Sequence, residues 1–197
     1  MRIRSIFLLV FLAASFIRPV DAGELKISSA ALERTLDMQL FSRDQGRYYL
    51  RGDAYSACSV VVDSPHVTFS AERVLVHVHV HAKLGKAMHG QCLGIDLARD
   101  VDVSIVPDAQ GETIGFRDAR IEKLSGSREL DIILMPFLSR SIPSSMRVNA
   151  ADQLRQLLSK STETTGYSMT LDRLLIHSMA VQTNALVIDV DGDLSVK

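Results

Sequence analysis

Residues 73–84 read RVLVHVHVHAKL, and their regular alternation decides the fold. Apolar residues occupy every second position from Val74 to Leu84, and charged residues and three histidines occupy most of the positions between them. Successive side chains of a β-strand point to opposite faces of the sheet. The stretch therefore predicts a strand with one apolar and one solvent-facing side, which is typical of an antiparallel sheet covering a core on one face.

Further strand patterns lie on both sides of this stretch. Between residues 48 and 124 the candidates are YYLRGDAYSACSVVV, HVTFSAERVLVHVHVHAKL, QCLGIDLARDVDVSIV and ETIGFRDARIEKL, with a turn at residues 107–111 between the last two. Near the C-terminus, YSMTLDRLLIHSMAVQ and ALVIDVDGDLSVK predict a hairpin that turns at Thr183 and Asn184. The last strand places Leu186, Ile188 and Val190 on its apolar face.

Two amphipathic helical segments are predicted, one before the strands and one after the first group of them. A helix at residues 29–41, capped by Ser28 or Ser29, has an apolar stripe at helical spacing that consists of Leu32, Leu36 and Leu40. A helical region at residues 128–146 has a broader apolar face that consists of Leu130, Ile133, Leu134, Phe137 and Leu138. Pro136 inside this region predicts a kink or a break into two pieces.

A short helix capped by Asn149 and a loop at residues 162–166 complete the predicted elements. Their order is a helix, about four strands, a helical region and two strands. Strands that follow strands through short turns favour an antiparallel sheet and an α+β fold. Residues 23–197 are long enough for one domain with a real core.

Residues 1–22 have the layout of a cleavable signal peptide. Two arginines precede an apolar run at residues 6–17, and small residues precede the expected cleavage between Ala22 and Gly23. The run is shorter than the roughly 20 residues that a membrane span needs. We therefore expect export to the periplasm and no transmembrane anchor.

The net charge of the chain and its sequence motifs argue against several classes of function. Removal of residues 1–22 leaves 22 − 3 = 19 Lys+Arg and 23 − 1 = 22 Asp+Glu, so the formal charge changes from −1 to −3. Nucleic-acid binders present a strongly basic face, and this composition argues against one. The sequence has no Gly-x-Ser-x-Gly, no phosphate-binding glycine loop and no recognised Cys–His pattern. We expect a protein that is not an enzyme and uses no cofactor.

Cys58 and Cys92 are the only cysteines, and a lone pair in an oxidising compartment most often forms a disulfide. The alternative is two buried free thiols.

The histidines of HVHVH, His77, His79 and His81, are the strongest metal candidates, because neighbours lie about 6–7 Å apart on one side of a strand. The competing interpretations are a plain solvent-facing strand surface and a pH-responsive patch. Residues 189–193, DVDGD, are interpreted as a solvated strand face, because the glycine is misplaced for a calcium loop.

The order of elements resembles the YceB-like periplasmic domains of bacteria, which are similar to the TULIP (tubular lipid-binding) superfamily. The residues that carry the resemblance are Ile27, Ser28, Leu32 and Leu36 at the start and Leu134, Pro136, Phe137 and Leu138 in the middle. The chain differs in lacking the lipoprotein cysteine and in having a cysteine pair. The resemblance implies a strongly curved antiparallel sheet wrapped around a long helix, with an N-terminal amphipathic helix.

The resemblance also implies an apolar tunnel that holds acyl chains between the sheet and the two helices. The expected lining residues are Leu32, Leu36, Leu40, Val76, Val78, Val80, Leu130, Ile133, Leu134, Phe137, Leu138, Ile188 and Val190. The partner would then be a lipid or another apolar small molecule. If protein side chains fill the gap, the alternative is an interaction module with a closed core that binds envelope proteins. A histidine-dependent metal-binding protein is the third hypothesis.

Overall fold

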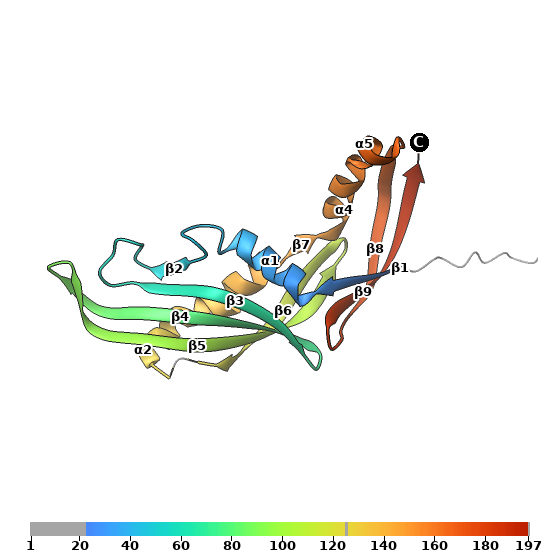
Figure 1. The fold of residues 1–197 in the computed structure, drawn as a ribbon. Helices are drawn as coiled ribbons and strands as arrows, with labels where there is room; N and C mark the ends of the chain where they lie inside the picture. The colour runs from blue at the N-terminus through green and yellow to red at the C-terminus, as the bar shows by residue number, and fades with distance from the viewer. Residues whose placement is uncertain (1–22, 125, 197) are drawn as a thin grey trace, which may run out of the picture.

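The computed structural model describes residues 23–124 and 126–196, so the predicted signal peptide lies outside the described residues. Two antiparallel sheets form the frame of this part of the chain (Figure 1). The larger sheet has the order β2-β3-β4-β5-β6-β7, with bounds Tyr48–Arg51, Val60–Ser70, Arg73–Met88, Gln91–Gln110, Thr113–Lys123 and Val148–Asn149. The smaller sheet has the order β1-β9-β8, with bounds Gly23–Ser28, Ala185–Val196 and Met169–Val181.

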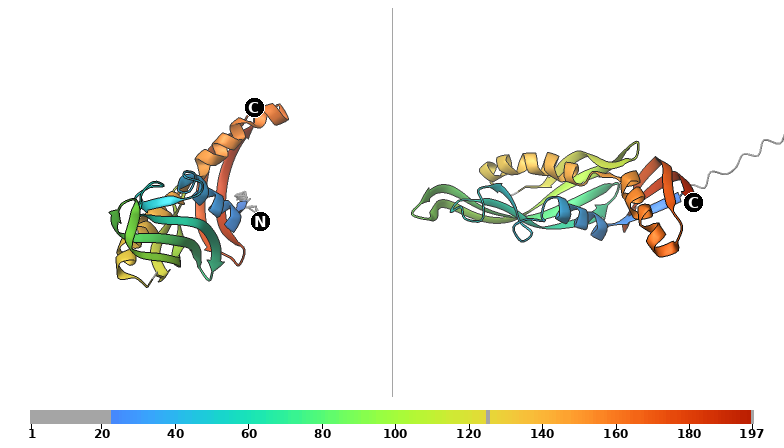
Figure 2. Two further views of the ribbon diagram at one scale, coloured as in Figure 1. Left: turned by 60° about the vertical axis from the view of Figure 1, so that its left-hand side comes forward. Right: turned by 90° about the horizontal axis from the view of Figure 1, so that it is seen from above.

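The helices connect and cover these sheets. Their bounds are Ser29–Gln39 for α1, Arg128–Pro136 for α2, Phe137–Ser141 for the π-helical turn η1, Ile142–Ser145 for α3, Ala150–Ser159 for α4 and Ser161–Thr165 for α5. The larger sheet curls strongly, and the smaller sheet with α4 and α5 lies at one end of it (Figure 2). The fold is therefore α+β with antiparallel sheets, as the element order predicts, and the larger sheet is strongly curled, as the resemblance implies.

The apolar face of the curled sheet encloses the main core. Val74, Val76, Val78 and Val80 on β4 are buried, while the residues between them are exposed to an intermediate degree. α1 packs on β3, and η1 and α3 pack on β6. Ser28 caps α1, since its hydroxyl oxygen accepts a hydrogen bond from the Ala31 amide at 3.3 Å. The predicted alternation of β4 is thus present in the structure.

Several predicted strand limits differ from the observed ones. The first two candidates each contain a turn: Gly52 to Ser59 separates β2 from β3, and Ala71 and Glu72 separate β3 from β4. The turn predicted at residues 107–111 is mostly strand, because β5 extends to Gln110. Pro107 fits there because β4 pairs with β5 only as far as Ile105, so the proline lies where one edge of β5 has no described strand partner.

The helical regions also differ in detail. α1 ends at Gln39 instead of residue 41, and the predicted loop at 162–166 is the one-turn helix α5 followed by Gly166 in the left-handed region. The region at 128–146 does not separate into two pieces at Pro136. It widens into the π-helical turn η1, in which the Ile142 amide bonds to the Phe137 carbonyl. Proline lacks an amide hydrogen, so a wider turn is one way to continue a helix past it.

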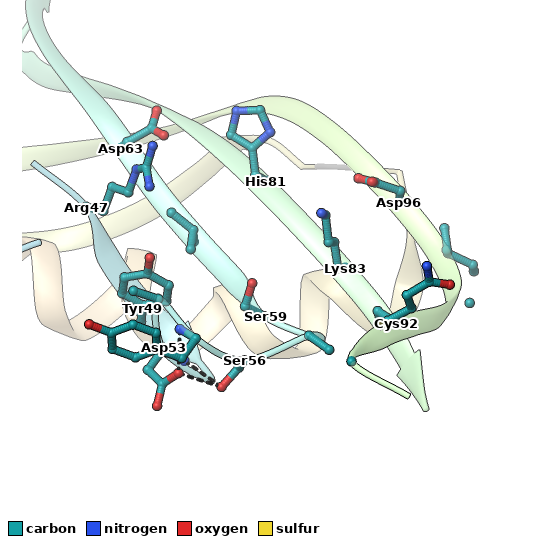
Figure 3. Close-up of a pocket in the computed structure, with 18 residues that line it drawn as sticks. Arg47, Tyr49, Asp53, Ser56, Ser59, Asp63, His81, Lys83, Cys92 and Asp96 are labelled. Carbon is teal, nitrogen blue, oxygen red and sulfur yellow. Dashed lines mark hydrogen bonds between the residues drawn. The ribbon is translucent and has the colours of Figure 1, made fainter. Parts of the chain in front are cut away.

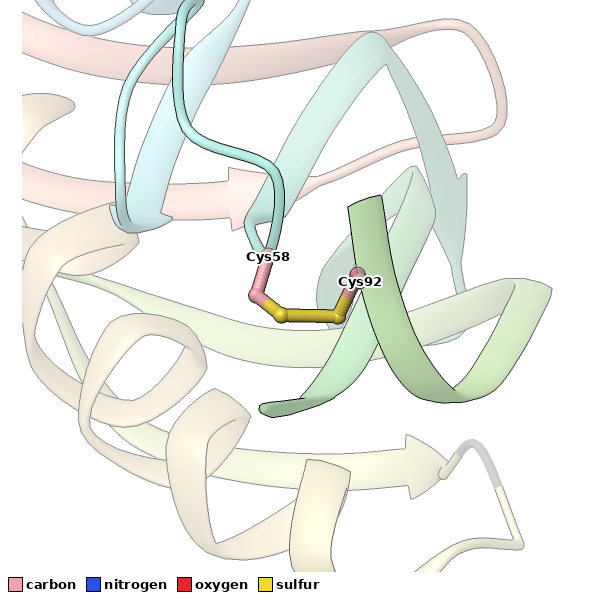
Figure 4. Close-up of a disulfide and its surroundings, with 2 residues drawn as sticks. All are labelled: Cys58 and Cys92. Carbon is pink, nitrogen blue, oxygen red and sulfur yellow. A yellow bond between two sulfur atoms is a disulfide. The ribbon is translucent and has the colours of Figure 1, made fainter. Parts of the chain in front are cut away.

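A paired glycine motif bends the long β4–β5 hairpin near its tip. Gly85 lies opposite Gly94, and a Cβ atom built on either would come within 2.1 Å of a carbonyl oxygen of the other strand. Only glycine allows strands to approach so closely. The hairpin beyond this point carries Cys92, which forms the predicted disulfide with Cys58 in the loop before β3 (Figure 4).

A candidate apolar site between the small sheet and α4

An apolar cavity of about 200 Å³ lies between α4 and the inner face of the small sheet. Glu24 is the only charged residue among the described residues that line it. The apolar lining comes from five elements and consists of Leu25, Ile114, Ala150, Leu154, Leu174, Ile176, Ile188 and Val190. A concave site with a nearly continuous apolar lining is the usual form of a site for an apolar ligand.

The strand register explains why these side chains converge. Leu25 lies opposite Ile188, and Val190 lies opposite both Gly23 and Ile176 on its two neighbouring strands. Directly opposed residues of antiparallel strands point to the same face. Gly23 adds no side chain, so space remains beside Val190. The apolar side chains of three strands therefore converge on the inner face of the small sheet.

A salt bridge holds α4 in position over the sheet. Two guanidinium nitrogens of Arg155 donate to the Glu112 carboxylate at 3.0 and 3.1 Å, and its third donates to the Leu171 carbonyl at 3.4 Å. The Arg155 hydrogen bond is the main reason that the pKa of Glu112 is lowered, and the same bond raises the pKa of Arg155. Arg155 thus links the helix to the β5–β6 turn and to β8, and β8 is another wall of the cavity.

Exposed apolar side chains continue from the cavity along α4 and β9. Leu157 follows Leu154 by one helical turn and is 68% exposed. Leu194 and Val196 share the apolar face of β9 with Val190, and they are 62% and 61% exposed. α4 and β9 therefore carry exposed apolar side chains beyond the residues that line the cavity.

The residues predicted to line a tunnel lie mostly elsewhere. Those that the structure places in the hydrophobic core are Leu32, Leu36, Val76, Val78, Val80, Leu130, Leu134, Phe137 and Leu138, with Leu40 and Ile133 partly buried against it. Ile188 and Val190 line the cavity. Ile114, Leu154, Leu174 and Ile176 also line it and were missed by sequence reasoning, although the apolar spacing within β8 and α4 could have indicated them.

A larger concave region is polar. A cleft of about 770 Å³ lies between the loop before β3 and the β4–β5 hairpin, and its lining includes Arg47, Asp63, His81, Lys83 and Asp96 (Figure 3). Asp53 at its edge accepts hydrogen bonds from the Ser56 hydroxyl and the Tyr55 amide, and these bonds lower its pKa. Charged groups of both signs make this cleft unsuitable for an acyl chain.

The three histidines of β4 make contacts with carboxylates and with one another. His77 Nδ1 lies 2.9 Å from an Asp102 oxygen, and His79 Nδ1 lies 2.6 Å from an Asp100 oxygen. The His79 contact lowers the pKa of Asp100. The His81 ring centre lies 4.5 Å from that of His79. Within residues 23–124 and 126–196, no three potential ligands are grouped to hold a metal ion.

Two other groups of polar side chains form hydrogen bonds or ion pairs outside the apolar cavity. His77 Nε2 also lies 3.0 Å from the Thr68 hydroxyl, which gives the hydroxyl–imidazole–carboxylate order of a catalytic relay. Thr68 lines neither the apolar cavity nor the polar cleft, so the relay belongs to neither site. Asp191 and Asp193, in the stretch interpreted as a solvated face, pair with His177 and Arg173 on the outer face of the small sheet.

In the described part of the chain, no helix has the length and apolar character needed to cross a membrane. No family model matches the chain, and no curated protein matches its sequence.

Proposed function

We propose that the protein is exported and binds an apolar chain, such as the acyl chain of a lipid, in the cavity between α4 and the small sheet. The observation that carries this proposal is the apolar lining of the cavity, in which Glu24 is the single charged residue within the described part of the chain. Each methylene that leaves water contributes about 0.8 kcal/mol, so several buried methylenes suffice for measurable binding.

The size of the cavity limits how much of a ligand it can hold. Its volume of about 200 Å³ is below the roughly 300–1,000 Å³ of pockets that enclose a drug-sized molecule. The end of an acyl chain fits inside, and the remainder lies along the exposed surface of Leu157, Leu194 and Val196. The polar headgroup then remains in solvent, where it needs no buried partner.

The resemblance to YceB-like and tubular lipid-binding domains supports the same class of ligand. A curled antiparallel sheet that packs on helices is compatible with that resemblance. The ligand position proposed here differs from a tunnel beneath the curled sheet, because the residues expected there belong to the core. The disulfide between Cys58 and Cys92 supports export, since disulfides persist in oxidising compartments.

The test is ligand binding by the protein purified from periplasm without detergent. Native mass spectrometry is expected to detect a bound acyl species, and a fluorescent fatty acid is expected to bind the delipidated protein. Leu154→Trp places a bulky side chain in the cavity. This variant is expected to bind the fluorescent fatty acid at least about tenfold more weakly, because the burial of even two methylenes is lost.

Ile132→Trp is the matched control, because Ile132 is 67% exposed on α2 and does not line the cavity. This variant is expected to bind the ligand as the unmodified protein does. A fluorescent fatty acid that binds the Leu154→Trp variant with unchanged affinity would contradict the proposed site. A protein that binds no fatty acid and carries no lipid would contradict the proposed function.

A further inference from the structure

Half of β9 has an open edge. β8 pairs with β9 along its whole length, from Leu186 to Val196, whereas β1 pairs only with residues 185–190. From Asp191 to Val196, no described strand lies on the side of β9 away from β8, as Figure 1 also shows. The backbone N–H and C=O groups that point to this side are therefore available to another strand.

The two faces beside this open edge differ in chemistry. The inner face carries Leu194 and Val196, which are more than 60% exposed, next to Gly192, which offers no side chain. The outer face carries Asp191 and Asp193. A strand that adds here would place alternate side chains against apolar and acidic neighbours.

The outer face of the small sheet keeps an excess of negative charge when its ion pairs are taken into account. Asp193 pairs with Arg173, and Asp191 pairs with His177, which is neutral or positive depending on pH. Asp189 on the same face and Asp172, which accepts a bond from Ser195, have no cation within salt-bridge distance in the described residues. Among the described residues beside the open edge, carboxylates thus outnumber cationic groups.

We propose that this edge binds an extended segment of another protein by strand addition, and that the segment alternates apolar and basic residues. Its backbone pairs with residues 191–196 of β9, in line with β1, its apolar side chains cover Leu194 and Val196, and its basic side chains face Asp191 and Asp193. Main-chain hydrogen bonds supply the affinity in this mode of recognition, and the side-chain alternation supplies the specificity.

A second copy of the chain is a poorer occupant of the same edge. Antiparallel pairing of β9 with β9 of another copy would bring two rows of aspartates together. Like charges directly opposite each other on neighbouring strands are destabilising. The charge of the edge therefore favours a basic partner. The partner strand would share Leu194 and Val196 with the proposed acyl-chain surface. The inference does not depend on acyl-chain binding, because the backbone pairing that carries it needs only the open edge of β9.

The experiment titrates the mature protein with a short capped peptide of alternating valine and lysine and follows backbone amide NMR signals. Shifts and new protection from hydrogen exchange are expected at residues 191–196. A peptide of alternating valine and glutamate is expected to bind at least about tenfold more weakly. The lysine peptide with alternate backbone nitrogens methylated is expected to bind more weakly by the same factor, because it cannot form the backbone hydrogen bonds of the ladder.

Two variants localise the contact. Leu194→Lys is expected to abolish the shifts, since it removes apolar area and adds a charge that repels the peptide. Met38→Lys is the control, because Met38 is also exposed, at 69%, on the remote helix α1. Equal binding of the methylated peptide, shifts outside β9, or a β9-mediated dimer of the protein alone would each overturn the proposal.

Discussion

At the scale of single residues, Glu112 contacts the helix α4 at two points. Its side chain binds Arg155 of α4, and its backbone carbonyl accepts a hydrogen bond from the Ala150 amide at 2.9 Å. It lies in the turn between β5 and β6. One residue therefore fixes both the start and the middle of the helix that covers the cavity.

The substitution Glu112→Gln is expected to lower the free energy of unfolding near neutral pH and to leave it unchanged in acid. Because the Arg155 hydrogen bond lowers the pKa of Glu112 from its ordinary value of 4.5, the carboxylate stabilises the folded state above that pH. This stabilisation is lost as the pH falls below 4.5 through the folded-state pKa. Urea unfolding at a series of pH values is expected to show a difference between the variant and the unmodified protein that is largest near neutrality and vanishes in acid.

Glu163→Gln serves as the control, since Glu163 is exposed on α5 and outside this network. Its unfolding midpoint is expected to follow that of the unmodified protein at every pH. A pH-independent loss in Glu112→Gln would show that the side chain acts by packing and not through its charge.

At the scale of elements, the bend of the β4–β5 hairpin depends on Gly85 and Gly94. Gly94→Ala is expected to straighten the hairpin tip or lower stability by several kcal/mol, because the added methyl would meet the Leu84 carbonyl oxygen at 2.0 Å. A straightened tip also draws Cys92 away from Cys58. Free-thiol labelling of the oxidised protein is therefore expected to increase, and thermal unfolding is expected to occur at lower temperature.

Gly192→Ala tests whether this effect is specific to the bend. Gly192 is also a strand glycine, but its nearest neighbour would lie 3.7 Å from the new Cβ atom, which is ordinary contact. This variant is expected to keep the disulfide and to unfold at nearly the same temperature. Similar thiol exposure in the two variants would count against a role for the close approach at Gly94.

The local elements could be predicted where the sequence has a regular period. The alternation around Val78 and the caps Ser28 and Asn149 depend on neighbours in sequence, and all three are observed. The turn at Ala71-Glu72 was missed because it has none of the residues that usually mark turns, and Ala71 takes a positive φ of 51°, which is uncommon for a residue with a side chain. The cavity could not be predicted, since its lining comes from residues as distant as Leu25 and Ile188.

At the scale of the whole molecule, the disulfide ties the loop before β3 to the tip of the hairpin. Cys58 and Cys92 are 34 residues apart, so the chain-entropy model gives roughly 3–4 kcal/mol of stabilisation. The double variant Cys58→Ser with Cys92→Ser is expected to lose up to about this free energy of unfolding in urea. Reduction of the unmodified protein is expected to have the same effect, and a reduced protein as stable as the oxidised one would contradict it.

The division into two sheets is a property of the whole chain that sequence patterns did not predict. The segment before α1 forms the strand β1, but nothing in its sequence, GELKIS, specifies which strand it pairs with. Its partner is β9, and the small sheet then places α4 over its inner face. Pairing between distant strands depends on the complete set of available edges and not on local periodicity.

The pairing of β1 with β9 also has a consequence for synthesis. Ser28 and Ala185 are neighbours in the sheet but lie 185 − 28 = 157 residues apart in the chain. At about 5–20 residues per second, a ribosome needs roughly 8–30 seconds to supply the partner of β1. During that interval the first strand remains open, and the small sheet with its cavity is assembled only after β9 has been translated.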